Sequence, residues 1–192
     1  MNKEEILKHY YGYDSFRPAQ AEIIEKILSK RDVLAIMPTS AGKSICFQVP
    51  ALMLDGITIV VSPLISLMYD QVTSLREMGI QAILLNSAMT LSEYYQSVEQ
   101  LRRGEVKLLY VAPERFEQEG FLEMMQGIQI SMVAVDEAHC ISQWGQDFRP
   151  SYQNIDTFVA QLPTRPIVAA FTATATPRVR QDIKQQLKLQ HP

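Results

Sequence analysis

MPTSAGKS, residues 37–44, is the stretch that decides the fold. It lies between an apolar run, VLAIM (33–37), and a segment of helical length and patterning (43–53). A turn that joins a strand to a helix presents backbone N–H groups to anions, and the helix dipole favours negative charge at that point. The stretch therefore predicts a phosphate-binding loop between a strand and a helix.

The residue types in this loop match the roles of a nucleotide site. Gly42 lets the chain approach a phosphate closely, Lys43 can reach the β- and γ-phosphates, and the Ser44 hydroxyl can ligate Mg²⁺. Met37 stands where the usual pattern begins with glycine. We expect ATP with Mg²⁺ as the ligand, held by Thr39, Ser40, Ala41, Gly42, Lys43 and Ser44.

Apolar runs rich in valine and isoleucine alternate with amphipathic segments along the whole chain. The runs are 33–37, 57–61, 82–85, 106–111, 130–135 and 167–171. The amphipathic segments are 18–28, 43–53, 64–78, 90–103, 117–126, 151–161 and 176–188. Because the runs do not alternate with polar residues, they suit strands that are buried on both faces. The pattern predicts an α/β fold, a parallel sheet with helices on both faces.

Length and composition limit the class of protein. The 192 residues carry 47% hydrophobic residues and a net charge of −3, which is typical of one globular domain, and we assign 1–192 to a single unit. No apolar run approaches the length of a membrane span, and the N-terminus lacks a signal-peptide core. Cys46 and Cys140 have no zinc or disulfide spacing. We expect a cytoplasmic protein without membrane contact.

A pair of carboxylates follows the run ISMVAV (130–135). We expect Asp136 to hold Mg²⁺ through water and Glu137 to orient and deprotonate the attacking water, because a hydrolase needs both roles. A solvated acidic turn is the simpler alternative. Carboxyl ends of parallel strands meet at one edge, where open sheets bind ligands, so this pair should lie near the phosphate loop.

Six stretches of the chain follow one another in a recognisable order. They are YGYDSFRPAQ (11–20), MPTSAGKS (37–44), VVSPLISLMYDQV (60–72), LYVAPERF (109–116), VDEAHCISQWGQDFRPSY (135–152) and AFTATAT (170–176). Asp136 to His139 resemble the DEAH box of superfamily 2 helicases, and the six stretches together resemble the RecQ family of DNA helicases. The likeness runs from about residue 10 to the C-terminus, with the family's motif 0 at 10–20. It implies the first RecA-like lobe, a P-loop NTPase lobe.

The resemblance implies an activity and partners. Such a lobe couples ATP hydrolysis to 3′–5′ unwinding of duplex DNA in repair or recombination. Single-stranded DNA and duplex junctions would be the substrates, and a second RecA-like lobe would supply an arginine over the γ-phosphate. Such an arginine accelerates hydrolysis by about 10³–10⁵. We therefore expect the 192-residue chain alone to be a nearly inactive monomer.

Three residues of motif 0 acquire nucleotide roles from the resemblance. Gln20 would hydrogen-bond the adenine edge, Tyr13 would stack on the base, and Arg17 would lie nearby. An amide fits this role because its donor and acceptor match adenine N6 and N7.

A further set of residues is expected to contact DNA or couple it to the nucleotide. Trp144, the only tryptophan, could stack on a base, and Arg149 could meet a phosphate. The alternatives are a core anchor for Trp144, loop capping, and ordinary turns. The set is Ser62, Asn86, Arg115, His139, Trp144, Phe148, Arg149, Thr172 and Thr174.

Other classes fit less well. A kinase would not need Glu137 beside Asp136, and the Asn-Lys-x-Asp stretch of a GTPase does not occur. An ATP-driven translocase or remodelling motor subunit of superfamily 2 shares the lobe and stays open as an alternative. So does a non-enzymatic DNA-binding module.

Overall fold

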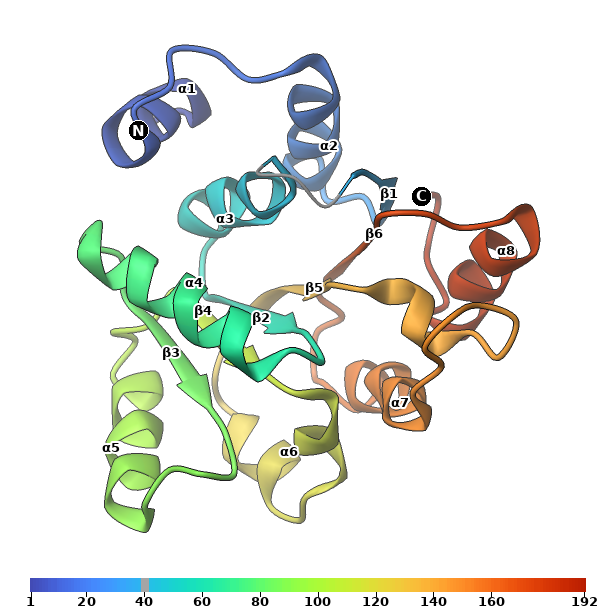
Figure 1. Cartoon of the computed structure of the whole chain (residues 1–192). Coiled ribbons are helices and arrows are strands. Elements are labelled where there is room, and N and C mark those ends of the chain that lie inside the picture. The colour runs from blue at the N-terminus through green and yellow to red at the C-terminus, as the bar shows by residue number, and fades with distance from the viewer. Residues whose placement is uncertain (39–41) are drawn as a thin grey trace.

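The computed structural model describes residues 1–38 and 42–192. In this part of the chain, six strands form one sheet in the order β1-β6-β5-β2-β4-β3, and every neighbouring pair is parallel (Figure 1). The strands are β1 (Val33–Ile36), β2 (Ile57–Val61), β3 (Ala82–Leu85), β4 (Leu108–Val111), β5 (Ile130–Val135) and β6 (Ile167–Thr172). Parallel pairing requires a crossover between strands, so all six carboxyl ends lie at one edge. The predicted α/β fold is confirmed.

Helices cover both faces of the sheet, as predicted. Figure 1 shows α1 to α3 at the top of the view and α5 to α7 at the bottom. The α-helices are α1 (Lys3–Ile6), α2 (Pro18–Leu28), α3 (Lys43–Met53), α4 (Ile65–Glu77), α5 (Leu91–Arg102), α6 (Phe121–Met125), α7 (Asn154–Ala160) and α8 (Pro177–Gln186). A π-helical turn, η1 (Leu7–Tyr11), continues α1, and three 3₁₀ turns are η2 (Pro113–Glu117), η3 (Ala138–Ile141) and η4 (Pro150–Gln153).

Two predicted helices are wrong in extent. The segment 117–126 is helical only from Phe121, because Gly120 has a φ of 84°, a left-handed conformation that separates α6 from the turn η2. The segment 151–161 becomes α-helical only at Asn154. Pro150 opens the 3₁₀ turn η4 ahead of it.

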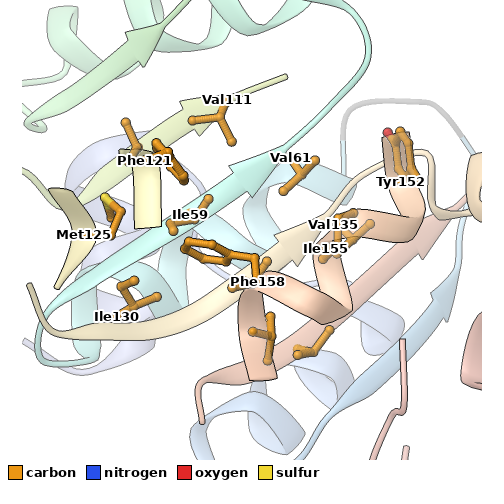
Figure 2. Packing of buried hydrophobic residues seen from close by; sticks show 14 of the residues in the cluster. Ile59, Val61, Val111, Phe121, Met125, Ile130, Val135, Tyr152, Ile155 and Phe158 are labelled. Atoms are coloured by element: carbon orange, nitrogen blue, oxygen red, sulfur yellow. The ribbon is translucent and has the colours of Figure 1, made fainter. Parts of the chain in front are cut away.

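Each face of the sheet has its own apolar core. On one face, buried side chains of α2, α3 and α4 pack on the strands. On the other face, α5 to α8 supply the packing, and Figure 2 shows Phe158 of α7 beside Phe121 of α6. The two rings have centroids 5.5 Å apart. Burial of both faces explains why the strands read as continuous apolar runs.

The edge opposite the carboxyl ends is tied together by Asp32. Its carboxylate accepts hydrogen bonds from Arg165 Nη2 at 2.7 Å, from the Val168 N–H at 2.9 Å and from the Gln190 N–H at 2.7 Å. Asp32 precedes β1, and Gln190 follows α8. One buried carboxylate therefore joins β1 and β6 to the segment beyond α8. In the described residues, no helix combines the length and apolarity that a membrane span needs.

Candidate active site

Lys43 and the two carboxylates meet at the carboxyl edge of the sheet. Lys43 Nζ lies 2.8 Å from Asp136 Oδ1 and 3.6 Å from Glu137 Oε1. Their side chains are between 4% and 18% exposed, so water screens these charges weakly. Lys43 is the first residue of α3, and the two carboxylates follow β5. In the sheet, β6 lies between β1 and β5. As predicted, the end of the phosphate loop lies next to the acidic pair.

The backbone at the acidic pair is held from several directions. The Asp136 N–H donates to the Val61 carbonyl at 2.9 Å, and Asp136 Oδ1 accepts from the Glu137 N–H at 2.9 Å. The buried Tyr152 hydroxyl donates to the Asp136 carbonyl at 2.9 Å. Glu137 has a φ of 51°, which is uncommon for a residue other than glycine and occurs often at functional sites. The pair is therefore fixed in a sharp turn between β5 and η3.

Gly42, which directly precedes α3, contacts the start of α2. Gln20 Nε2 donates to the Gly42 carbonyl at 3.1 Å, and Gln20 Oε1 accepts from the Arg17 N–H at 2.9 Å. A Cβ at Gly42 would lie 2.9 Å from Gln20 Nε2 and 3.3 Å from Arg17 Nη1. Gly42 has a φ of −101°, which any residue can adopt, so a larger side chain here would be opposed only by the need to move Gln20 and Arg17. Motif 0 and the end of the phosphate loop are in direct contact.

The residues assigned to the nucleotide are only partly placed. Thr39, Ser40 and Ala41 lie outside the described residues. Ser44 is half-buried in the first turn of α3, while Tyr13 and Arg17 are exposed. Within residues 1–38 and 42–192, the Gln20 side chain accepts one hydrogen bond at its carbonyl and donates one from its amide nitrogen. Its predicted contact with adenine stays a prediction.

His139 connects the acidic pair to the end of β6. His139 Nδ1 lies 2.8 Å from Thr172 Oγ1 and 3.6 Å from Glu137 Oε2. The Thr172 hydroxyl also lies 3.2 Å from the carbonyl of Thr174, which is exposed. These contacts connect His139, Thr172 and Thr174. That the three residues couple DNA contact to the nucleotide stays a prediction.

The loop after the DEAH box presents its tryptophan to solvent. Trp144 is 59% exposed, so the alternative of a core anchor is wrong. Phe148 and Arg149 are half-buried, and Arg149 Nη2 lies 3.3 Å from Asp147 Oδ2. The Arg149 N–H donates to the Cys140 carbonyl at 2.8 Å, which closes the loop onto the end of η3.

Three other residues assigned to DNA make local contacts. Ser62 is buried, and its hydroxyl accepts from the Leu64 N–H at 3.3 Å. Asn86 Oδ1 accepts from the Ala88 N–H at 2.8 Å. Arg115 is 8% exposed and donates to Gln118, and burial lowers the pKa of its guanidinium. These contacts match the capping alternative, and the burial of Ser62 and Arg115 leaves little of either side chain open to DNA.

Sequence reasoning missed a buried polar chain behind the site. The Tyr11 hydroxyl donates to Gln48 Oε1 at 2.7 Å, and Gln48 Nε2 donates to the Tyr110 hydroxyl at 3.0 Å. The Tyr110 hydroxyl in turn donates to Gln71 Oε1 at 2.8 Å. The chain links η1, α3, β4 and α4. A signal was available, since Gln48 is the one polar residue in the apolar stretch ICFQVPAL of α3.

Comparison with known proteins agrees with this geometry. The family model of the DEAD/DEAH box helicase matches residues 17–183. The chain is 51% identical over 188 residues to the ATP-dependent DNA helicase RecQ of Bacillus subtilis (strain 168), covering 97% of this chain and 32% of that protein. It is 47% identical over 186 residues to RecQ of Haemophilus influenzae, covering 97% and 30%. The chain thus spans about a third of the length of these curated relatives.

A solved structure supports the same fold. The Hef helicase domain of Pyrococcus furiosus superposes with a TM-score of 0.71 at 19% identity, covering 91% of this chain and 36% of that one. At this identity the likeness concerns the fold alone. The family model matches residues 17–183, most of the sequence, and this match shows that the chain belongs to the DEAD/DEAH box helicase family.

Proposed function

We propose that this chain is the ATP-binding lobe of a DNA helicase that uses ATP hydrolysis to unwind duplex DNA in the 3′–5′ direction. The observation that carries the proposal is the contact of Lys43 with Asp136 and Glu137 at the carboxyl edge. The relatives named above support DNA as the substrate, because they are called ATP-dependent DNA helicases. The 3′–5′ direction of unwinding and a role in DNA repair or recombination are inferred from the resemblance to RecQ proteins.

The ion pair suggests how ATP would enter the site. Lys43 Nζ pairs with Asp136 Oδ1 at 2.8 Å. Phosphate oxygens at the end of the loop would draw Lys43 away from this carboxylate, which would then be free for a cation. Binding would thus replace one buried ion pair by another, so neither charge would be left buried and unpaired.

The oxygen donors at this edge fit a magnesium ion. Asp136 offers a carboxylate and Ser44 a hydroxyl, and Mg²⁺ prefers a few such oxygens supplemented by phosphates and water. Among the described residues, no group of three or more His, Cys, Asp and Glu side chains is arranged to hold a metal by itself. The nucleotide would therefore have to complete the coordination. When bound, the ion would neutralise charge that develops on the phosphate oxygens.

Glu137 is the residue proposed to activate water. Its carboxylate lies within 3.6 Å of both Lys43 Nζ and His139 Nδ1. In the proposed step, water attacks the γ-phosphorus, its proton passes to a Glu137 oxygen, and the bond to the β-phosphate oxygen breaks. Because Glu137 and His139 are in one group with Thr172, a change at the end of β6 could alter the orientation of the base.

Glu137→Gln tests the assignment. It retains size and hydrogen bonding, whereas Lys43→Ala would leave the buried Asp136 without its partner. In the full reading frame that contains this chain, we expect nucleotide binding to persist and turnover to fall by roughly 10²–10⁴-fold. Glu99→Gln on α5 is the matched control, because Glu99 is exposed and distant in sequence from the site. Unchanged turnover in Glu137→Gln would contradict the proposal.

The remaining parts of the proposal concern partners. We expect a second RecA-like lobe to complete the site, so the 192-residue chain alone should be a monomer that hydrolyses ATP negligibly. Strand-separation and translocation assays on the full reading frame test the unwinding activity. Movement along DNA without separation of its strands would contradict the proposal.

A further inference from the structure

Arg178 lies over the exposed tryptophan of the loop after the DEAH box. Its guanidinium carbon is 3.4 Å from the centroid of the Trp144 ring, a cation–π contact at van der Waals distance. Arg178 is the second residue of α8, and 34 positions separate it from Trp144 in sequence. Trp144 remains 59% exposed, so the guanidinium covers part of the indole and leaves the rest open to solvent.

The neighbour of Arg178 lies close to the adjacent loop residue. Val179 is buried, and a Cβ added at Gly145 would lie 3.4 Å from Val179 Cγ2. The first turn of α8 is itself fixed, because Thr176 Oγ1 accepts from the Val179 N–H at 3.2 Å. Arg178 and Val179, consecutive residues of α8, therefore lie next to Trp144 and Gly145, consecutive residues of the loop.

The other side of the tryptophan is held by its own loop. The Trp144 N–H donates to Ser142 Oγ at 3.1 Å, and Ser142 is fully buried next to η3. The backbone of Trp144 is thus anchored on the DEAH side, whereas Arg178 contacts its ring from α8.

We propose that Arg178 is a positioning residue for single-stranded DNA. It occupies one face of Trp144 and thereby keeps the opposite face in place for a stacking base. The inference rests on the proposed function, since it assumes that DNA reaches Trp144. The proposal gives a specific role to α8, the element that follows β6 in the chain. No other residue of α8 has been assigned a contact with DNA.

The contact itself can be tested without DNA. Trp144 is the only tryptophan of the 192-residue chain, so its fluorescence reports on one ring. Arg178→Met removes the cation and keeps much of the length, and Lys184→Met removes one charge from an exposed position of the same helix. We expect lower anisotropy and stronger acrylamide quenching in Arg178→Met alone, with partial recovery in Arg178→Lys. Identical fluorescence in the two methionine variants would overturn the proposal.

The role in DNA binding is tested by a double-mutant cycle. In the full reading frame, Arg178→Met should weaken binding of an oligo-dT strand by roughly twofold to fivefold, the range of an exposed cation–π contact. Trp144→Ala should weaken it by roughly fivefold to 100-fold. If Arg178 acts through the ring, adding Arg178→Met to Trp144→Ala should cause no further loss.

Salt dependence separates this role from a phosphate contact. Loss of one phosphate contact lowers the slope of log affinity against log salt by about 0.7 for a single strand. We expect an unchanged slope in Arg178→Met. A lowered slope together with additive losses in the cycle would overturn the positioning role. If the fluorescence behaves as expected but wild-type protein does not bind oligo-dT, the proposed DNA function fails and the ring contact stands.

Discussion

Tyr152→Phe removes one atom from the support of Asp136, one of the two carboxylates proposed to act on ATP. Tyr152 is fully buried, and its hydroxyl donates to the Asp136 carbonyl at 2.9 Å. The ring packs in the core drawn in Figure 2, so phenylalanine fills the same space. A buried hydrogen bond contributes about 1 kcal/mol net, and a carbonyl left without a donor raises the loss to about 1–3 kcal/mol. A loss of about 2 kcal/mol, in the middle of this range, corresponds to a melting temperature lower by about 4–8 °C in a domain of this size.

Urea unfolding of the 192-residue chain measures this loss directly. The urea concentration at the midpoint of unfolding should fall. The slope of the unfolding free energy against urea concentration should stay constant, because the surface exposed on unfolding is the same. Tyr94→Phe is the matched control, since the Tyr94 hydroxyl lies 3.4 Å from the sulfur of Met124, a weak acceptor. It should cost less than about 0.5 kcal/mol. Equal stability of Tyr152→Phe and wild type would refute the support of Asp136 by Tyr152.

The pH dependence of the same pair of proteins adds a second check. Burial raises the pKa of Tyr152 far above its ordinary value, so the native hydroxyl stays protonated. Because the folded pKa lies above the unfolded one, the tyrosine's contribution is complete below pH about 10 and declines above it. The stability difference between wild type and Tyr152→Phe should therefore stay constant from pH 6 to 9 and shrink above pH about 10.

Two further predictions concern buried groups away from the nucleotide. Asp32→Ala should lower the free energy of unfolding by about 3 kcal/mol in urea, because it removes the carboxylate that pairs with Arg165 and leaves the Val168 and Gln190 N–H groups without their acceptor. Asp55→Ala, at an exposed position, should have little effect, and equal losses in the two variants would contradict this. Burial raises the pKa of Cys46 and Cys140 to about 12, so both thiols stay protonated at pH 8. A disulfide reagent should label neither cysteine in the native chain and both in urea, and rapid labelling of the native chain would disprove this.

The sequence predicted the fold well because its strands are buried on both faces. The runs at 57–61, 82–85 and 130–135 coincide with β2, β3 and β5. Helix α6 was misjudged because the left-handed Gly120 interrupts an otherwise continuous pattern. In that segment, one backbone angle outweighed the amphipathic spacing.

The site was predictable only in part. Lys43, Asp136 and Glu137 could be brought together from sequence, since each follows a strand and parallel strands end at one edge. The contacts of Gln20 with Gly42 and of Arg178 with Trp144 could not, because they join segments 22 and 34 positions apart and leave no local pattern. Ser62 and Arg115 stand in stretches that resemble family motifs, yet their burial depends on packing that those stretches do not reveal.

The closed loop between Cys140 and Tyr152 has an entropic consequence. It is fastened by the Arg149 N–H on the Cys140 carbonyl and by the Tyr152 hydroxyl on the Asp136 carbonyl. Ordering a free backbone costs about 1–2 kcal/mol per residue, and in a loop fastened in this way much of that cost is incurred when the protein folds. A base docked on Trp144, as proposed, would therefore meet a surface that needs little further ordering, and more of the stacking free energy would be available for holding the strand.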